Sequence, residues 1–178
     1  MAKIELIMGD ITKQKVCAIV NAANSSLMGG GGVDGAIHHA AGPKLLEECI
    51  KIAKERRNIP GGPCPAGDAV ITAGYNLPCK NIIHTAGPVW QGGKQGEPET
   101  LASCYRSSLL LAAKAGLKSI AFPNISTGVF GYPKDKAVVV AVDTVTQTLR
   151  ETPNIERVVF VCFDEENFEL YRGVLAAG

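Results

Sequence analysis

The chain has 178 residues, of which 46% are hydrophobic and 20% are charged, a composition that suits one globular domain with a substantial core. Its formal net charge of +1 does not favour a broad nucleic-acid surface. Charges interrupt the first segment at once, and no apolar run approaches the roughly 20 residues that span a bilayer. We therefore expect a cytoplasmic protein without a signal peptide or membrane helix, with residues 1–178 in a single domain.

Strand and helix patterns alternate along the chain. In chain order, we expect a strand over 4–8, a strand over 17–21, a helix over 35–57, strands over 69–72 and 81–85, a helix over 99–115, a strand over 119–124, a helix over 135–150, a strand over 157–163 and a helix over 165–175. This alternation predicts a largely parallel sheet with helices on both faces. The first strand is a candidate for an antiparallel edge strand.

The six cysteines do not form a metal-binding pattern. No two make a C-x-x-C pair, and several lie in apolar runs, so in a reducing compartment they are expected to be small buried hydrophobes. A zinc site is disfavoured at this spacing, and we expect neither a metal nor a cofactor. A cysteine nucleophile stays open, because the sequence singles out none of them. They are Cys17, Cys49, Cys64, Cys79, Cys104 and Cys162.

Small, polar and glycine-rich segments follow several of the expected strands. In open α/β sheets, ligands bind beyond the carboxyl ends of the strands. We therefore expect these segments to converge on one ligand site. They are residues 9–12, 21–34, 85–88, 125–132 and 163–164.

Four consecutive glycines, Gly29 to Gly32 (the glycine loop), follow a strand and precede a helix. Glycine lets backbone N–H groups approach an anion without a Cβ in the way, and a helix N-terminus adds positive dipole character. A diphosphate is therefore the expected ligand, and a flexible loop without a ligand is the alternative. Gly30, Gly32 and Gly35 also fit G-x-G-x-x-G. This dinucleotide fingerprint is disfavoured, because residues 21–28 separate the strand from the first glycine.

Asp34 lies where the glycine loop meets the helix, and His38 shares its helix face four residues later. A carboxylate and an imidazole beside a phosphate loop could position and activate water, and Asn24 could bind a ribose hydroxyl. The competing interpretations are an N-cap role for Asp34 and a structural role for His38. We expect His39 at the surface and His84 to be a hydrogen-bonded residue at a strand end.

A second loop, residues 125–133, directly follows another expected strand. Its Ser126, Thr127 and glycines are expected to close over the other side of the diphosphate, and Phe130 to pack on a sugar face. Plain packing is the alternative for Phe130.

Two further candidates end strands. Asp10 could accept a hydrogen bond from an exocyclic amine, and an N-cap or turn role is at least as well supported. Phe163 could stack on a purine, and core packing is the interpretation that the sequence alone favours.

Residues 9–12, 21–24, 29–36 and 125–133 together resemble the motifs of a macro domain, in family order. The stretch Gly-Gly-Gly-Val-Asp-Gly-Ala-Ile-His is similar to the MacroD-type branch, and the likeness is closest to bacterial O-acetyl-ADP-ribose deacetylases. It extends from about Ile4 to Tyr171. The resemblance implies a three-layer α/β/α fold with a mostly parallel mixed central sheet that binds ADP-ribose.

The resemblance also implies roles for individual residues. At the adenine end, Asp10 would bind the amino group, the backbone of Ile11 would sit beside the ring and Phe163 would lie against it. Two sets would bracket the diphosphate: Gly30, Gly31, Gly32 and Val33, and Ser126, Thr127, Gly128, Val129 and Phe130. At the distal ribose, the implied set is Asn21 and Asn24 as ribose contacts, Asp34 to orient or activate the attacking water, and His38 in support.

The family removes the acyl group from O-acetyl-ADP-ribose and also hydrolyses mono-ADP-ribose esters of glutamate and aspartate, so ADP-ribosylated proteins are expected partners. Whether Asp34 is a general base or only positions water stays open, since the phosphate of the substrate is a competing base. A non-catalytic ADP-ribose reader is the alternative, and the presence of Asn24 and Asp34 argues against it. Similar bacterial proteins are linked to ribonuclease III regulation, a role that the near-neutral charge does not support.

Overall fold

The computed structural model describes residues 2–178 as a mixed α/β protein. The strands are β1 (Lys3–Met8), β2 (Ala18–Ala23), β3 (Ala69–Ala73), β4 (Asn81–Ala86), β5 (Ser119–Phe122) and β6 (Arg157–Cys162). The helices are α1 (Gly32–Ala41), α2 (Pro43–Glu55), α3 (Glu97–Lys114), α4 (Lys134–Leu149), α5 (Glu165–Ala177) and the short 3-10 helix η1 (Ile11–Lys13). None of these helices has the length and apolar character that a membrane crossing needs. Every expected element is present, with its ends shifted by two residues or fewer, except the helix over 35–57.

The helix expected over 35–57 is in fact two helices. α1 ends at Ala41 and α2 begins at Pro43, and Gly42 between them has a φ of +90°. Glycine adopts this left-handed φ without steric cost, and Pro43 cannot supply the backbone N–H that a continuous helix requires. The N–H of Gly42 donates to the carbonyl of His38 at 3.1 Å and so caps α1. The prediction of one long helix was therefore wrong.

The strands form one mixed sheet in the order β1-β6-β5-β2-β4-β3. All neighbouring pairs are parallel except β3 and β4. β1 lies at an edge, but it runs parallel to β6, so the first strand was the wrong candidate for an antiparallel edge. The antiparallel strand is β3 at the opposite edge, because residues 74–80 are too short a connection for the crossover that a parallel pair needs.

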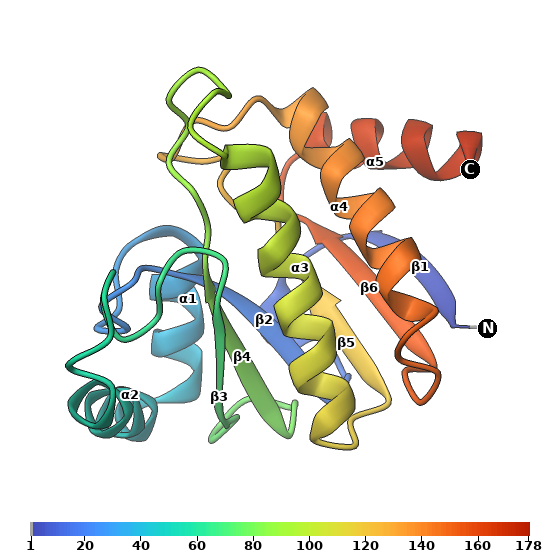
Figure 1. Cartoon of the computed structure of the whole chain (residues 1–178). Helices are drawn as coiled ribbons and strands as arrows, with labels where there is room; N and C mark the ends of the chain where they lie inside the picture. The colour runs from blue at the N-terminus through green and yellow to red at the C-terminus, as the bar shows by residue number, and fades with distance from the viewer. Residues whose placement is uncertain (1) are drawn as a thin grey trace.

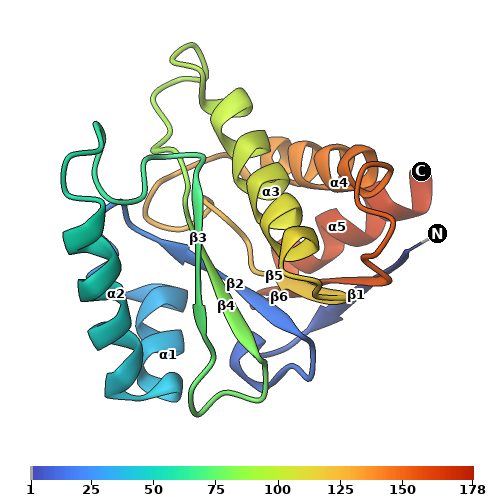
Figure 2. The ribbon, with the colours of Figure 1, turned by 60° about the horizontal axis from the view of Figure 1, so that its bottom comes forward.

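Helices cover both faces of the sheet and make three layers (Figures 1 and 2). α1 and α2 pack on one face, and α3, α4 and α5 pack on the other. Side chains of β6 alternate between the two sides: Val158 and Phe160 join the core beneath α3 and α4, whereas Val159 and Val161 join the core beneath α1 and α2. The predicted three-layer α/β/α fold with a mostly parallel mixed sheet is confirmed.

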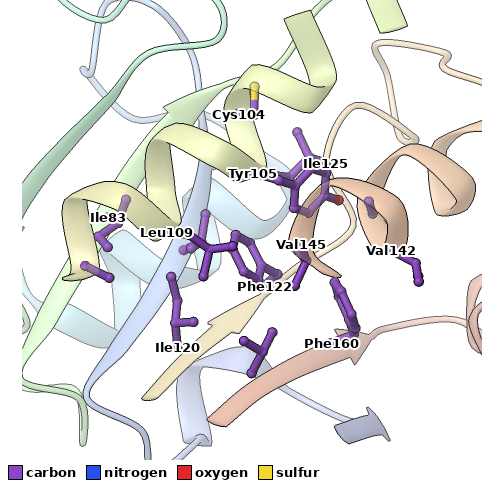
Figure 3. Packing of buried hydrophobic residues seen from close by; sticks show 14 of the residues in the cluster. Ile83, Cys104, Tyr105, Leu109, Ile120, Phe122, Ile125, Val142, Val145 and Phe160 are labelled. Carbon is purple, nitrogen blue, oxygen red and sulfur yellow. The ribbon is translucent and has the colours of Figure 1, made fainter. Parts of the chain in front are cut away.

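A chain of aromatic rings runs through the larger core (Figure 3). The ring centroids of Tyr105 and Phe122 are 5.1 Å apart, those of Phe122 and Phe160 are 6.1 Å apart, and those of Phe160 and Tyr171 are 4.9 Å apart. Tilted pairs at these distances stabilise a core beyond the area that they bury. These ring pairs connect β5 and β6 to α3 and α5. They therefore help to hold in place two of the strands whose carboxyl ends carry the expected ligand site.

All six cysteines are free thiols, and five of them are buried. Burial raises the pKa of Cys49, Cys64 and Cys162 to about 11. Cys17 is half-buried just before β2, and a hydrogen bond with the Ser119 side chain lowers the pKa of its thiol. The expectation of small buried hydrophobes is therefore confirmed for every cysteine except Cys17.

Candidate active site

The residues expected at a ligand site lie at one edge of the sheet. β1, β6, β5, β2 and β4 run parallel, so their carboxyl ends share that edge. Across it, the strand order places Asp10 after β1, Phe163 after β6, Ser126 beyond β5, Asn24 after β2 and Gly87 after β4. Segments that are far apart in the sequence thus follow neighbouring strands.

Asp34 occupies the first turn of α1 and is only 5% exposed. Its Oδ1 accepts a hydrogen bond from Asn21 Nδ2 at 2.8 Å, and His38 Nε2 lies 3.4 Å from the same oxygen. The N-cap of α1 is Gly31, so the alternative that Asp34 caps the helix is wrong. The carboxylate is instead buried and held through one oxygen.

The second oxygen of Asp34 faces the glycine loop. A Cβ at Gly30 would lie 3.4 Å from Asp34 Oδ2 and 3.5 Å from Asn24 Nδ2, so the backbone of Gly30 is close to both groups. Asn24 Nδ2 donates to the carbonyl of Gly29 at 2.8 Å, and its Oδ1 accepts from the N–H of Ser26 at 3.1 Å. These bonds tie the glycine loop to the residues before it.

The glycine loop leads directly into the N-terminus of α1. Gly31 is the N-cap residue, and Gly32 and Val33 begin the first turn. No side chain caps this terminus, whereas Asp164 caps α5 through the N–H of Asn167. The first N–H groups of α1 are therefore not occupied by a capping side chain, which suits an anion.

His38 lies on the face of α1 that carries Asp34, as the four-residue spacing predicted. Its side chain is 15% exposed, and its ring lies beside Gly29, where an added Cβ would come within 3.8 Å of it. His39 is exposed, which confirms that it points elsewhere. His84 is hydrogen-bonded in β4, also as predicted.

The second loop is closed by its own backbone. The N–H of Tyr132 donates to the carbonyl of Ser126 at 2.9 Å, and the N–H of Gly131 donates to that of Gly128 at 3.0 Å. Ser126 has a φ of +67° and a buried hydroxyl without a hydrogen-bond partner. Val129 at the tip is 103% exposed, and Thr127 and Phe130 are half-buried.

Sequence reasoning placed residues 85–88 at the site but missed the segment around Trp90, which supports the second loop. The N–H of Trp90 donates to the carbonyl of Phe130 at 2.8 Å, and the rings of Trp90 and Tyr132 are 4.6 Å apart between centroids. A Cβ at Gly87 would overlap the Ser126 hydroxyl and would approach Ile125 Cγ2 to 2.7 Å. Only glycine therefore fits beneath this loop at the end of β4.

Glu97 organises that supporting segment. This carboxylate is buried in the first turn of α3 and accepts from the N–H groups of Gln91, Gly93 and Gln95 at 2.7, 2.9 and 2.6 Å. Burial opposes ionisation, but the backbone donors outweigh it and lower the pKa of Glu97 to about 2. The sequence held one signal for it, an acidic residue at a helix start.

The part of the site that follows β1 and β6, on the far side of the sheet from β4, is more exposed to solvent. Asp10 caps η1, and its Oδ1 accepts from the hydroxyl and the N–H of Thr12 at 2.6 and 2.9 Å, which lowers the pKa of the carboxyl. The turn interpretation of Asp10 is thus correct as local structure, and its second oxygen stays available. Ile11 is buried. Phe163 is 89% exposed, so the core packing that the sequence alone favoured is wrong.

Comparisons with known proteins agree with this geometry. The family model described as Macro domain matches residues 20–141. A protein of Enterobacter sp. (strain 638) named O-acetyl-ADP-ribose deacetylase is 56% identical over 173 residues, which cover 97% of this chain and 93% of that protein. Several other similar bacterial proteins carry the same name, which denotes a hydrolase.

Solved structures share the fold over almost the whole chain. The Oceanobacillus iheyensis macrodomain with ADP superposes with a TM-score of 0.93 at 46% identity and covers 99% of this chain and 91% of its own. The Trypanosoma brucei macrodomain in complex with ADP-ribose gives a TM-score of 0.86 at 42% identity, with 97% and 68% covered.

A mixed sheet with this strand order, which lies between two layers of helices and has a glycine loop leading into α1, therefore defines a macro domain fold. The chain belongs to the macro domain family. The resemblance predicted from the sequence is confirmed. Within residues 2–178, no cluster of three His, Cys, Asp or Glu side chains is arranged to hold a metal ion.

Proposed function

We propose that this protein binds ADP-ribose and hydrolyses O-acetyl-ADP-ribose to ADP-ribose and acetate. The names of its relatives and the ligands of the two macrodomain structures support this activity. The observation that carries the proposal is the arrangement around Asp34. Its carboxylate is held through Oδ1, while Oδ2 and the Asn24 amide both lie close to the backbone of Gly30.

The ligand would lie across the row of strand ends. Asp10 would accept a hydrogen bond from the adenine amino group beside the backbone of Ile11, and the exposed ring of Phe163 would lie against the base. The diphosphate would bind between the N–H groups of residues 30–33 and those of residues 126–130. Asn24 would contact the distal ribose. The role of Asn21 as a second ribose contact stays a prediction.

In this orientation the ester carbonyl of the substrate would lie beside Asp34. A water that is hydrogen-bonded to Asp34 Oδ2 attacks the carbonyl carbon, and its proton passes either to this carboxylate or to a phosphate oxygen of the substrate. The bond between the carbonyl carbon and the ribose oxygen then breaks. The ribose oxygen takes up a proton, and acetate leaves. His38 supports the site from the other oxygen of the carboxylate.

The same chemistry would release mono-ADP-ribose from glutamate or aspartate side chains of proteins. Each of these bonds is an ester between a carboxyl group and a hydroxyl of the distal ribose, so attack at the carbonyl carbon would again release a ribose oxygen. The glycine loop and the second loop are partly exposed, which leaves room for a protein beside the scissile bond. We therefore propose ADP-ribosylated proteins as a second substrate class.

The test measures hydrolysis of both esters side by side by the wild type and by Asp34→Ala, with calorimetry of ADP-ribose binding. We expect turnover to fall by about an order of magnitude or more in Asp34→Ala, while binding is retained. Asp135→Ala is the matched control, because Asp135 also lies in the first turn of a helix but is exposed.

Unchanged turnover in Asp34→Ala would remove this carboxylate from the mechanism. Tight binding of ADP-ribose by a wild type that releases no acetate would favour the second candidate function, a binding module without turnover. Hydrolysis of only one ester would identify the substrate class.

A further inference from the structure

Asp34 rests on a line of buried polar side chains that crosses the sheet. Asn21 in β2 and His84 in β4 are direct partners in the parallel ladder. Asn21 Nδ2 lies 2.8 Å from Asp34 Oδ1 and 3.1 Å from His84 Nδ1, and His84 Nε2 lies 3.0 Å from Thr72 Oγ1 in β3. All four side chains are buried, and those of Asn21 and His84 are 0% and 1% exposed.

The donor in each of these bonds follows from elimination. An ionised carboxylate only accepts, so the Asn21 amide must turn its nitrogen toward Asp34. The second hydrogen of that nitrogen faces His84 Nδ1, which must therefore be an acceptor. The proton of a neutral imidazole then lies on Nε2 and is donated to Thr72 Oγ1, whose hydroxyl donates to the carbonyl of Ala73 at 3.1 Å.

His84 can hold this tautomer over a wide pH range. Burial, with a smaller contribution from the nearby His38, lowers the pKa of His84 to about 3. The rings of the two histidines are 6.4 Å apart between centroids. A protonated His84 would turn a second donor toward the Asn21 amide nitrogen, so the neutral state is also the one that the hydrogen bonds require.

The arrangement leaves one polar atom unsatisfied. Asn21 Oδ1 is buried and has no hydrogen-bond partner. The reversed amide would point this oxygen at the Asp34 carboxylate, an acceptor that would repel it. The Asn21 amide is therefore oriented to donate to its two neighbours, although its own carbonyl oxygen is left without a hydrogen bond. An unsatisfied buried oxygen is uncommon for a polar group whose role is only to fill a core.

We propose that His84 is a positioning residue: its Nδ1 fixes the Asn21 amide, which holds Asp34 Oδ1 and leaves Asp34 Oδ2 beside Gly30. His84 itself touches neither the ligand nor the attacking water. The inference rests on the proposed hydrolysis for its effect on turnover. It also differs from a direct ribose contact by Asn21, because both amide hydrogens of that residue are already used within the protein and its carbonyl oxygen is buried.

The test compares two substitutions that separate activity from stability. His84→Asn keeps an amide oxygen near the place of Nδ1 and so preserves the acceptor for Asn21, although its smaller side chain leaves a cavity. His84→Leu fills the space but removes the acceptor. We expect kcat to fall about tenfold or more in His84→Leu and to recover largely in His84→Asn, while the Kd for ADP-ribose stays unchanged in both. Ser108→Ala is the matched control, because it removes a buried hydrogen bond within α3, outside this line of side chains.

The expected order of melting temperatures is the reverse, with His84→Leu above His84→Asn. A kcat that follows the melting temperature, or that is unchanged in His84→Leu, would overturn the proposal. NMR of the wild-type imidazole nitrogens gives a readout that needs no variant to fold. We expect a proton on Nε2 and none on Nδ1 between pH 5 and 8, values within the range where histidine usually titrates. A proton on Nδ1 would also overturn it.

Failure of the proposed function would look different. A wild type that hydrolyses neither ester would overturn the hydrolase assignment, and with it the effect of His84 on turnover, whatever tautomer NMR finds. Hydrolysis by the wild type together with full activity of His84→Leu would overturn the positioning role alone.

Discussion

The glycine loop and the second loop carry the same predicted role, yet they are held in different ways. The glycine loop is fixed by the residues just before it, because the Asn24 side chain binds the carbonyl of Gly29 and the N–H of Ser26. The second loop closes through its own backbone and leans on a neighbour, since Phe130 accepts from the N–H of Trp90. Residues 88–96, which contain Trp90, are gathered by the single carboxylate of Glu97.

This difference shows that two loops of similar composition can be supported differently, one by residues nearby in the sequence and the other by residues far away in it. The support of the glycine loop lies within a few residues, so a local motif includes it. The support of the second loop comes from a segment about 40 residues earlier in the chain. The sequence of the loop itself therefore does not indicate which residues support it. Substitutions far from the second loop should therefore affect it more than substitutions at its tip.

The largest effect in this comparison is expected from Glu97→Gln. An amide nitrogen would face backbone N–H groups that now donate to a carboxylate, so residues 88–96 would lose their anchor and release the second loop. We expect the melting temperature at pH 7 to fall by several degrees and ADP-ribose binding to weaken. Glu99→Gln, in the same turn of α3 but exposed, is the matched control.

The pH dependence of Glu97 has a definite sign. Its pKa is lowered from 4.5 to about 2 in the folded protein, so its contribution to stability is complete above about pH 4.5 and is lost as the pH falls toward 2. The gap in melting temperature between wild type and Glu97→Gln should therefore shrink below pH 4.5. Lower stability with undiminished ligand binding would show that the second loop does not depend on this segment.

A smaller effect on ADP-ribose binding is expected from Phe163→Ala, because Phe163 belongs to neither loop. Its exposed ring would lose one stacking contact with the base, and we expect the Kd for ADP-ribose to rise about tenfold, which corresponds to about 1.4 kcal/mol. The melting temperature should stay nearly constant, because an exposed ring contributes little to the core. Phe163→Tyr keeps the ring and should bind like the wild type. Equal affinity in both variants would place the base elsewhere.

The smallest effect is expected from Val129→Ala at the tip of the second loop. This side chain is fully exposed, and only the backbone is assigned to the diphosphate. Stability should stay within about 0.5 kcal/mol of the wild type, and the Kd within a factor of about two. Calorimetry and thermal melts measure both. A marked loss of affinity would mean that the side chain, rather than the backbone, contacts the ligand.

Much of the fold follows from local pattern. The alternation of apolar runs predicted every strand, and the segments after them predicted the edge that carries Asp10, Ser126 and Phe163. Strand direction does not appear in such a pattern, because side chains alternate in the same way in either direction. The antiparallel β3 was therefore missed, although its short connection to β4 held the information.

The candidate site was predictable only where its partners are near in sequence. Asp34 and His38 share a helix face, and spacing alone placed them together. The bond from Asn21 to His84 joins residues 63 positions apart, so it depends on which strands are neighbours. The exposure of Phe163 was also hidden, because an aromatic residue after an apolar strand has the same pattern whether the chain buries it or leaves it at the rim.

The thiol of Cys17 can be labelled at the end of β2 opposite to the proposed ligand site. Five other thiols are buried, and only Cys17 combines partial exposure with a lowered pKa. It lies just before β2, whose six residues extend about 20 Å to Asn24. A maleimide dye should therefore couple to one position and leave the proposed ligand site unobstructed.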